Sequence, residues 1–167
     1  MKGSKILFHE VQLLRDSPVK WLMLISSLLA IAGISILAIT GNIPPEEIPF
    51  AFGVTIPVLV LCYLLIHVGR LETVVTEEGI FIKWKPLNMK LLQIHKHEID
   101  HAEPRKSPAF HYGFGMWPGY GAIHNVKGRE GLQLYLKNGK KVFIGTQDSF
   151  LFRKALEKLT VSVSKIQ

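Results

Sequence analysis

Apolar residues are distributed unevenly along the chain, and two long runs hold almost no charge. The first run, 19–40, contains one charged residue, Lys20, and the second run, 48–69, contains none. A helix of either length, at about 1.5 Å per residue, reaches roughly 33 Å and crosses the roughly 30 Å hydrocarbon layer of a bilayer. A cleaved signal peptide is the alternative for the first run, but its apolar core is only about 7–15 residues long. The pattern therefore predicts a hairpin of two transmembrane helices.

The stretch before the first run, 1–18, shows a different periodicity. Leu7, Val11 and Leu14 share one face of a helix, and polar residues fall on another face. This pattern predicts an amphipathic helix lying at the membrane surface, which Pro18 ends where the chain turns into the bilayer. A helix packed on a soluble domain fits the same periodicity.

From Leu71 onward the apolar runs give way to short alternating segments separated by turn residues. The segment GLQLYLKNGKKVFIG is the clearest hairpin, because Asn138 and Gly139 favour a tight turn between two alternating strands. Asp148 is placed to cap a final helix whose apolar face is Phe152, Ala155, Leu156 and Leu159. We therefore expect seven strands and one C-terminal helix over 71–167, folded as a small barrel or sandwich with the helix over one open end.

The distribution of Lys and Arg predicts how the helical hairpin is oriented in the membrane. Basic residues precede the first run and follow the second, and the intervening loop GNIPPEE has none. Because short segments rich in Lys and Arg stay in the cytoplasm, we expect a protein of the cytoplasmic (inner) membrane with both termini inside. Residues 1–69 carry equal numbers of acidic and basic side chains, so the formal net charge of +7 belongs to the β-rich part.

This excess of positive charge would lie beside anionic lipid head groups, which attract Lys and Arg. The alternative is that these residues form a solvated surface, whose positive charge reflects only the usual excess of Lys and Arg on the cytoplasmic side. The residues that we expect to face lipid are Lys83, Lys85, Arg105, Lys106, Lys127 and Arg129.

The tract 110–128, FHYGFGMWPGYGAIHNVKG, combines aromatic rings with glycines and has no acidic residue. Its order of glycines lacks the strand-to-helix context of a nucleotide site, and the predicted membrane anchor makes nucleic acid an unsuitable partner. We interpret it as an irregular connection with a contact surface for a protein partner or a second copy. The alternative is that its rings fold back as a satellite core. The residues predicted to contact the partner are Tyr112, Phe114, Trp117 and Tyr120.

No pattern in the chain predicts catalysis, a cofactor or a metal site. The only cysteine, Cys62, lies inside the second apolar run, and no nucleophile motif is present. His95, His97 and His101 have the same parity on a strand, but a turn is expected between them and no further ligand motif accompanies them. We therefore expect a protein that is not an enzyme.

Three stretches together resemble a family of small bacterial membrane proteins in which two transmembrane helices precede a domain similar to pleckstrin-homology (PH) domains. They are HEVQ at 9–12, YGFGMWPGYGAIHNVKGREGLQLYL at 112–136 and NGKKVFIGTQ at 138–147. The resemblance implies a surface helix at 1–18, a hairpin with spans 19–40 and 48–69, and a PH-like domain at 71–167. The loop at Glu77 and Glu78 is acidic, unlike the basic loop of phosphoinositide-binding PH domains.

Two functions remain for such a chain. The first is a membrane-anchored PH-like module that mediates protein interaction or self-association at the cytoplasmic face. The second is a sensor that holds a lipid or small ligand at the mouth of the barrel near the 110–128 tract.

Overall fold

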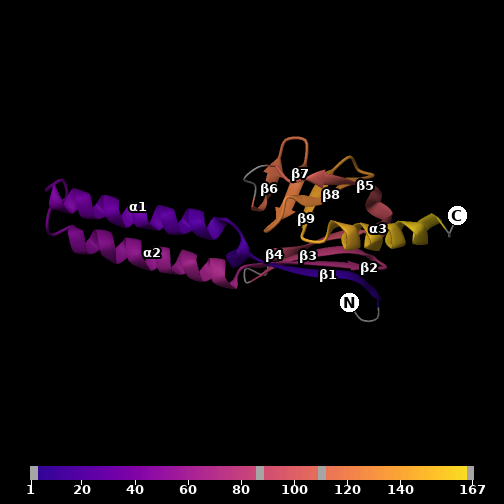
Figure 1. Cartoon of the computed structure of the whole chain (residues 1–167), viewed down its shortest axis with the longest axis horizontal. Helices are drawn as coiled ribbons and strands as arrows, with labels where there is room; N and C mark the ends of the chain where they lie inside the picture. The colour runs from indigo at the N-terminus through magenta and orange to yellow at the C-terminus, as the bar shows by residue number, and fades with distance from the viewer. Residues whose placement is uncertain (1–3, 86–88, 109–111, 165–167) are drawn as a thin grey trace.

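The computed structural model describes residues 4–85, 89–108 and 112–164. A long helical hairpin extends from one end of a β-rich domain, and a helix covers another part of that domain (Figure 1). The predicted helical hairpin is confirmed: α1 is Val19–Ile39 and α2 is Ile48–Val68. Both helices are long and apolar enough to cross a membrane. Their outward side chains, such as Leu22, Leu28 and Phe50, are exposed and offer the apolar surface that lipid would cover.

The helix predicted over 1–18 is wrong, because Ile6–Leu13 forms a β-strand, β1. It pairs antiparallel with β2 (Arg70–Thr76), from Ile6 opposite Thr76 to Leu13 opposite Arg70. The strand was hidden because two of its inward positions carry Glu10 and Gln12, so apolar and polar residues do not alternate in the usual way. Its partner also lies beyond the entire helical hairpin in the sequence. The β-rich domain therefore begins before the first apolar run.

The helical hairpin is inserted between two neighbouring strands of one sheet. A short 3₁₀ turn, η1 (Leu14–Asp16), leads from β1 into α1. The Leu14 amide donates to the Gly69 carbonyl over 2.8 Å, so the two ends of the inserted segment meet. A side chain at Gly69 would place its Cβ 2.8 Å from the Leu65 carbonyl oxygen and 3.1 Å from a Leu14 methyl carbon. Glycine is therefore required by this close approach.

The β-rich part consists of two sheets. The first has the order β1-β2-β3-β4, with β3 at Gly79–Lys85 and β4 at Met89–His95. A 3₁₀ turn, η2 (Lys96–Glu98), leads into the second sheet, whose order is β5-β8-β9-β7-β6. Its strands are β5 Ile99–Lys106, β6 Gly113–Trp117, β7 Gly121–Asn125, β8 Glu130–Leu136 and β9 Lys141–Thr146. Only β7 and β9 run parallel within these ladders.

The predicted seven-stranded barrel needs correction in two respects. Over the described residues, eight strands follow the helical hairpin, and the additional one is β6 inside the glycine-rich tract. Hydrogen bonding also leaves the described strands in two separate sheets, without closure into one barrel. The sequence prediction of a mostly β region followed by a helix is confirmed at this coarser level.

The core lies between the sheets and beneath the C-terminal helix, α3 (Ser149–Ser164). The predicted apolar face of α3 is buried, and the Leu151 amide donates to the Asp148 carboxylate at its start over 2.9 Å. Phe8 of β1 stacks on Phe152 of α3 with ring centroids 5.1 Å apart. The N-terminal strand thus contributes to the core as well as to the sheet.

Two polar side chains of β1 connect the sheets. Gln12 is 1% exposed; its side-chain oxygen accepts from the amides of Val126 and Lys127 at 3.1 and 3.0 Å, and its nitrogen donates to the Gly145 carbonyl at 2.8 Å. Glu10 accepts from the Thr146 hydroxyl and from the Gln147 amide. Each bond satisfies a backbone or side-chain group at the ends of β7 and β9, so β1 fastens the second sheet to the first.

We expect β1 to be indispensable to the β domain. A fragment of residues 70–167 should be markedly less stable than a chain in which 4–14 is joined to 69–167 by a short Gly-Ser linker, because the fragment leaves β2 without its neighbour and uncovers Leu71 and Val75. Urea unfolding followed by circular dichroism compares the two proteins. Equal unfolding midpoints would contradict this role of β1.

Substitution Gln12→Ala should lower the free energy of unfolding of the linked chain by about 2–4 kcal/mol, because it leaves the Val126 amide and the Gly145 carbonyl of the second sheet without their hydrogen-bond partner. The matched control is Gln93→Ala on β4, whose side chain is exposed and whose loss should cost within about 0.5 kcal/mol. Urea unfolding measures both. A Gln12→Ala protein as stable as the control would show that the bridge contributes nothing.

Candidate functional site

The strand β6 forms an exposed, uncharged edge of the second sheet. It pairs only with β7, from Gly113 opposite Asn125 to Trp117 opposite Gly121, so its other edge has no partner strand among the described residues. Phe114, Met116 and Trp117 are 52%, 82% and 45% exposed. Figure 1 shows β6 on the side of the sheet nearest the helical hairpin. An edge strand with large apolar side chains on the surface is suited to contact another molecule.

The opposite edge of the same sheet differs in composition. β5 has the sequence IDHAEPRK, in which four of the eight residues are charged and Pro104 removes a backbone donor. Such residues discourage the addition of another strand. β6 carries neither a charge nor a proline. Of these two edges, β6 is the one whose composition permits pairing.

Glycines shape the turn that returns β6 to β7. Gly119 and Gly121 have φ angles of +79° and +73°, which only glycine adopts readily. A Cβ at Gly121 would also collide with the Lys141 carbonyl of β9. The tract that looked irregular in the sequence is therefore a tight β-hairpin packed on its neighbour strand.

Tyr120 and Arg105, which were predicted to contact a partner and lipid respectively, contact each other. The guanidinium of Arg105 lies 3.5 Å from the centroid of the Tyr120 ring and donates to the Gly119 carbonyl at 2.8 Å. The Tyr120 hydroxyl donates to the Lys106 carbonyl at 3.0 Å, and its ring meets Phe143 edge to face. These contacts tie the β6–β7 turn to β5, so both half-buried side chains hold this turn in place.

Phe114 belongs to a cluster that joins the two sheets beside β6. Its ring centroid lies 5.6 Å from that of Trp84 on β3, and the Trp84 indole N–H donates to His124 Nδ1 at 3.4 Å. Burial lowers the pKa of His124 from 6.5 to about 4. The imidazole is therefore neutral at pH 7 and serves as an acceptor in an apolar surrounding.

Three other predicted residues line one hollow of about 240 Å³. Tyr112, Lys106 and Arg129 surround it together with the segment around Gly128. This hollow brings the predicted lipid-facing and partner-contact residues together at the start of β6. Lys127 is exposed next to it.

The remaining predicted lipid-facing residues, Lys83 and Lys85, lie on β3 in the other sheet and are half-buried. Lys85 pairs with Glu72 at 3.6 Å, and His9 lies 3.2 Å from the same carboxylate. Burial raises the pKa of Glu72, but the His9 hydrogen bond and the charges of Lys85, His9 and Lys83 outweigh it and lower that pKa. The charge of Lys85 is thus partly neutralised within the first sheet.

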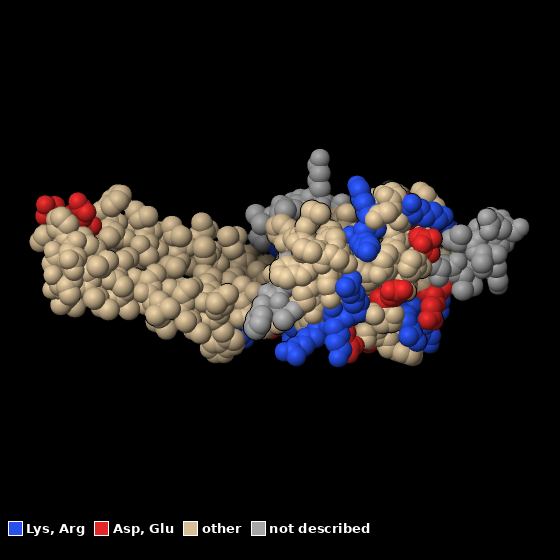
Figure 2. All heavy atoms as spheres, turned by 90° about the horizontal axis from the view of Figure 1, so that it is seen from above, with Lys and Arg blue, Asp and Glu red and all other residues tan. Residues whose placement is uncertain are grey.

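Figure 2 shows how charge divides the molecule. Lys and Arg gather on the β domain, whereas the helical hairpin is almost free of charge on the face shown apart from acidic residues at its far loop. This division matches the sequence pattern from which the orientation in the membrane was predicted.

The three histidines of interest do not converge. His95 and His97 stack with ring centroids 5.4 Å apart, whereas His101 lies on β5 against Tyr135 and pairs with Asp100 at 2.7 Å. Within the described part of the chain, no group of three or more His, Cys, Asp or Glu side chains is placed to hold a metal ion.

Sequence reasoning missed Met116, the most exposed apolar residue of β6. The segment Gly113 to Trp117 alternates glycine with large apolar residues, which is a strand pattern of period two. The density of glycine in the tract favoured an irregular connection instead. That alternation was the signal that could have located both the strand and its exposed face.

Comparison of the chain with protein-family models, with curated proteins and with solved structures finds no match. The geometry and the sequence pattern therefore carry the functional argument.

The neutral state of His124 predicts a pH-dependent stability. Because its pKa is lower in the folded chain than in the unfolded chain, the unfolded state binds the proton first as the pH falls below 6.5. Stability from this group is complete above that pH and is lost toward pH 4, by up to about 2 kcal/mol between pH 7 and pH 5. Urea unfolding at the two pH values, followed by tryptophan fluorescence, measures the loss. His124→Gln should remove this part of the slope, and an unchanged slope would refute the assignment.

Proposed function

We propose that this chain is a non-enzymatic, membrane-anchored PH-like module that binds an extended segment of a partner protein along β6 at the cytoplasmic face. The observation that carries the proposal is the uncharged edge of β6, with Phe114, Met116 and Trp117 substantially exposed. A bound segment would add a strand to the second sheet. Its main chain would supply hydrogen bonds, and its side chains would cover the apolar residues.

The position of β6 favours a partner that is itself a membrane protein. β6 lies on the side of its sheet next to the start of α1 and the end of α2 (Figure 1), which would lie at the membrane surface if these helices cross a bilayer. A juxtamembrane stretch of a partner in the same membrane would reach this strand directly. Confinement to the membrane raises the effective concentration of both proteins, so a short strand suffices for useful affinity.

The contacts of β1 support the PH-like part of the proposal. The stretches that carry the family resemblance are distant in sequence, yet Glu10 and Gln12 contact Val126, Gly145 and Thr146. Residues of the stretches that carry the resemblance thus join the two sheets. The two sheets and the terminal helix agree with such a domain in their general arrangement.

A lipid or small-ligand sensor is the second candidate, and the hollow at the start of β6 is the observation in its favour. Lys106 and Arg129 supply positive charge there and Tyr112 supplies a hydroxyl. This combination suits an anionic head group. The test below therefore separates a protein partner from a lipid.

Replacement of Met116 by a photo-crosslinking amino acid in the full chain, in native membranes, should yield crosslinks to a partner protein. The same replacement at Leu151 on α3 is the matched control, since Leu151 is also apolar and 50% exposed but lies away from β6. Phe114→Lys should reduce the Met116 crosslinks at least fivefold, because a charge on the edge opposes strand addition. Circular dichroism verifies that the variant is folded.

The identity of the crosslinked species decides between the candidates. Crosslinks to a different membrane protein support the proposal. Crosslinks only to lipid favour the sensor. Crosslinks only between copies of the chain would show that β6 binds a second copy and not a different protein. No crosslink above the Leu151 control would reject β6 as the contact surface.

A further inference from the structure

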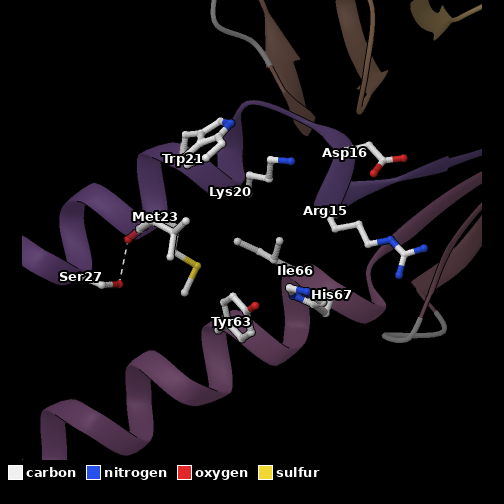
Figure 3. A pocket seen from close by; sticks show the side chains of 10 residues that line it. Arg15, Asp16, Lys20, Trp21, Met23, Ser27, Tyr63, Ile66 and His67 are labelled. Carbon is white, nitrogen blue, oxygen red and sulfur yellow. Dashed lines mark hydrogen bonds between the residues drawn. The ribbon is translucent and has the colours of Figure 1, made fainter.

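A second cavity lies where the helical hairpin meets the β domain, and no residue of β6 lines it. It has a volume of about 360 Å³ and opens between η1, the start of α1 and the end of α2 (Figure 3). The side chains that matter for its chemistry are Arg15, Asp16, Lys20, Trp21, Tyr63 and His67. None of the functions considered so far uses this cavity.

The cavity lies at the level expected for lipid head groups if α1 and α2 cross a bilayer. Lys20 is the second residue of α1, and His67 is the last but one of α2. Trp21 and Tyr63 are 60% and 46% exposed, and these two residue types favour the boundary between acyl chains and head groups. The site thus spans the border between water and hydrocarbon.

The lining has a polar end and an apolar end. Arg15, Asp16 and Lys20 come from the segment next to the β domain, whereas Met23, Leu24 and Ile66 lie further along the helices. Figure 3 shows Met23 and Ser27 on the hairpin side of the cavity and Arg15 and Asp16 on the other. This order matches a phospholipid, whose charged phosphate adjoins an apolar glyceride.

The basic groups at the polar end are available for a ligand. No acidic group of the described residues lies within 4.0 Å of Arg15 or Lys20, in contrast to Lys85, which pairs with Glu72. The Lys20 ammonium lies 5.5 Å from the centroid of the Trp21 ring. Asp16 is the one carboxylate among the residues that line the cavity, so the lining has two basic side chains besides His67 and one acidic side chain.

Hydrogen bonds hold the turn that carries Arg15 and Asp16. The Ser17 side chain is buried and donates to the Leu14 carbonyl at 2.7 Å, and the Leu14 amide is bonded to Gly69. Tyr63 and His67 lie one helical turn apart with ring centroids separated by 4.3 Å. The backbone that carries the basic residues is therefore held by hydrogen bonds, which reduces the entropy lost when a ligand binds.

We propose that this cavity binds the phosphate of an anionic phospholipid. Lys20 and Arg15 bind the phosphate oxygens, and Trp21 and Tyr63 flank the glyceride. The net single positive charge of Arg15, Lys20 and Asp16 favours a head group with one negative charge. Phosphatidylglycerol is such a lipid, and its hydroxyls can donate hydrogen bonds to the Asp16 carboxylate. The site requires that α1 and α2 are inserted in the membrane, but it does not depend on a partner at β6.

The test uses the full chain, purified in mild detergent and titrated with phosphatidylglycerol or phosphatidylcholine, with bound lipid counted by native mass spectrometry. We expect a preference for phosphatidylglycerol. Lys20→Gln and Arg15→Gln should each weaken its binding about fivefold, as for loss of one basic contact at a membrane surface. Lys20→Arg should retain it.

Lys140→Gln is the matched control, because it removes the same charge from the exposed β8–β9 turn and should leave lipid binding unchanged. Inorganic phosphate, added as competitor, distinguishes the two sources of the phosphate group. Failure of millimolar phosphate to displace the lipid supports a phospholipid site. Displacement by phosphate alone would show that the cavity is a site for the free anion, and equal binding of both lipids or no effect of Lys20→Gln and Arg15→Gln would overturn the proposal.

Discussion

The antiparallel pairing of β1 with β2 is the contact on which the arrangement of this protein depends. Because the helical hairpin departs from Leu14 and returns at Gly69, the β domain holds it at two adjacent points. A single tether would allow the domain to rotate freely. Two strands of one sheet, each continuous with one helical segment, instead fix how the domain sits relative to the helix ends. Every surface of the domain thereby acquires a defined direction with respect to the bilayer that the helices would cross.

Hydrogen bonds from β1 fix the second sheet relative to the first. Gln12 and Glu10 point inward from β1 and satisfy groups at the ends of β7 and β9. A buried glutamine is stabilising only when its partners are in place, so the bridge selects one relative placement of the sheets. Apolar side chains in the same positions would fill the space without specifying that placement. This accounts for polar residues at positions of β1 where a strand would ordinarily bury apolar ones.

The two surfaces with a functional interpretation both result from this geometry. β6 ends its sheet on the side near the helices, and the cavity lined by Lys20 and Tyr63 lies at the junction itself. One offers an apolar edge that has no partner strand among the described residues, and the other offers basic groups beside an apolar space. They differ in their chemistry, yet both adjoin the ends of α1 and α2. The proposed anchoring and the proposed recognition would therefore use the same junction.

The sequence alone determined the features that arise from local composition. The low charge of α1 and α2, the alternation in β8 and β9, and the cap at Asp148 each act over a few residues, so the chain pattern was sufficient to predict them. The tertiary structure decided the position of β1, because its pairing with β2 and its bonds to Val126 and Gly145 join residues that are distant in the chain. It also decided which large side chains of the 110–128 tract are exposed: the Tyr120 ring is covered by Arg105, whereas Met116 faces outward. Local periodicity cannot distinguish these cases, since burial depends on which strand or side chain a distant part of the chain supplies.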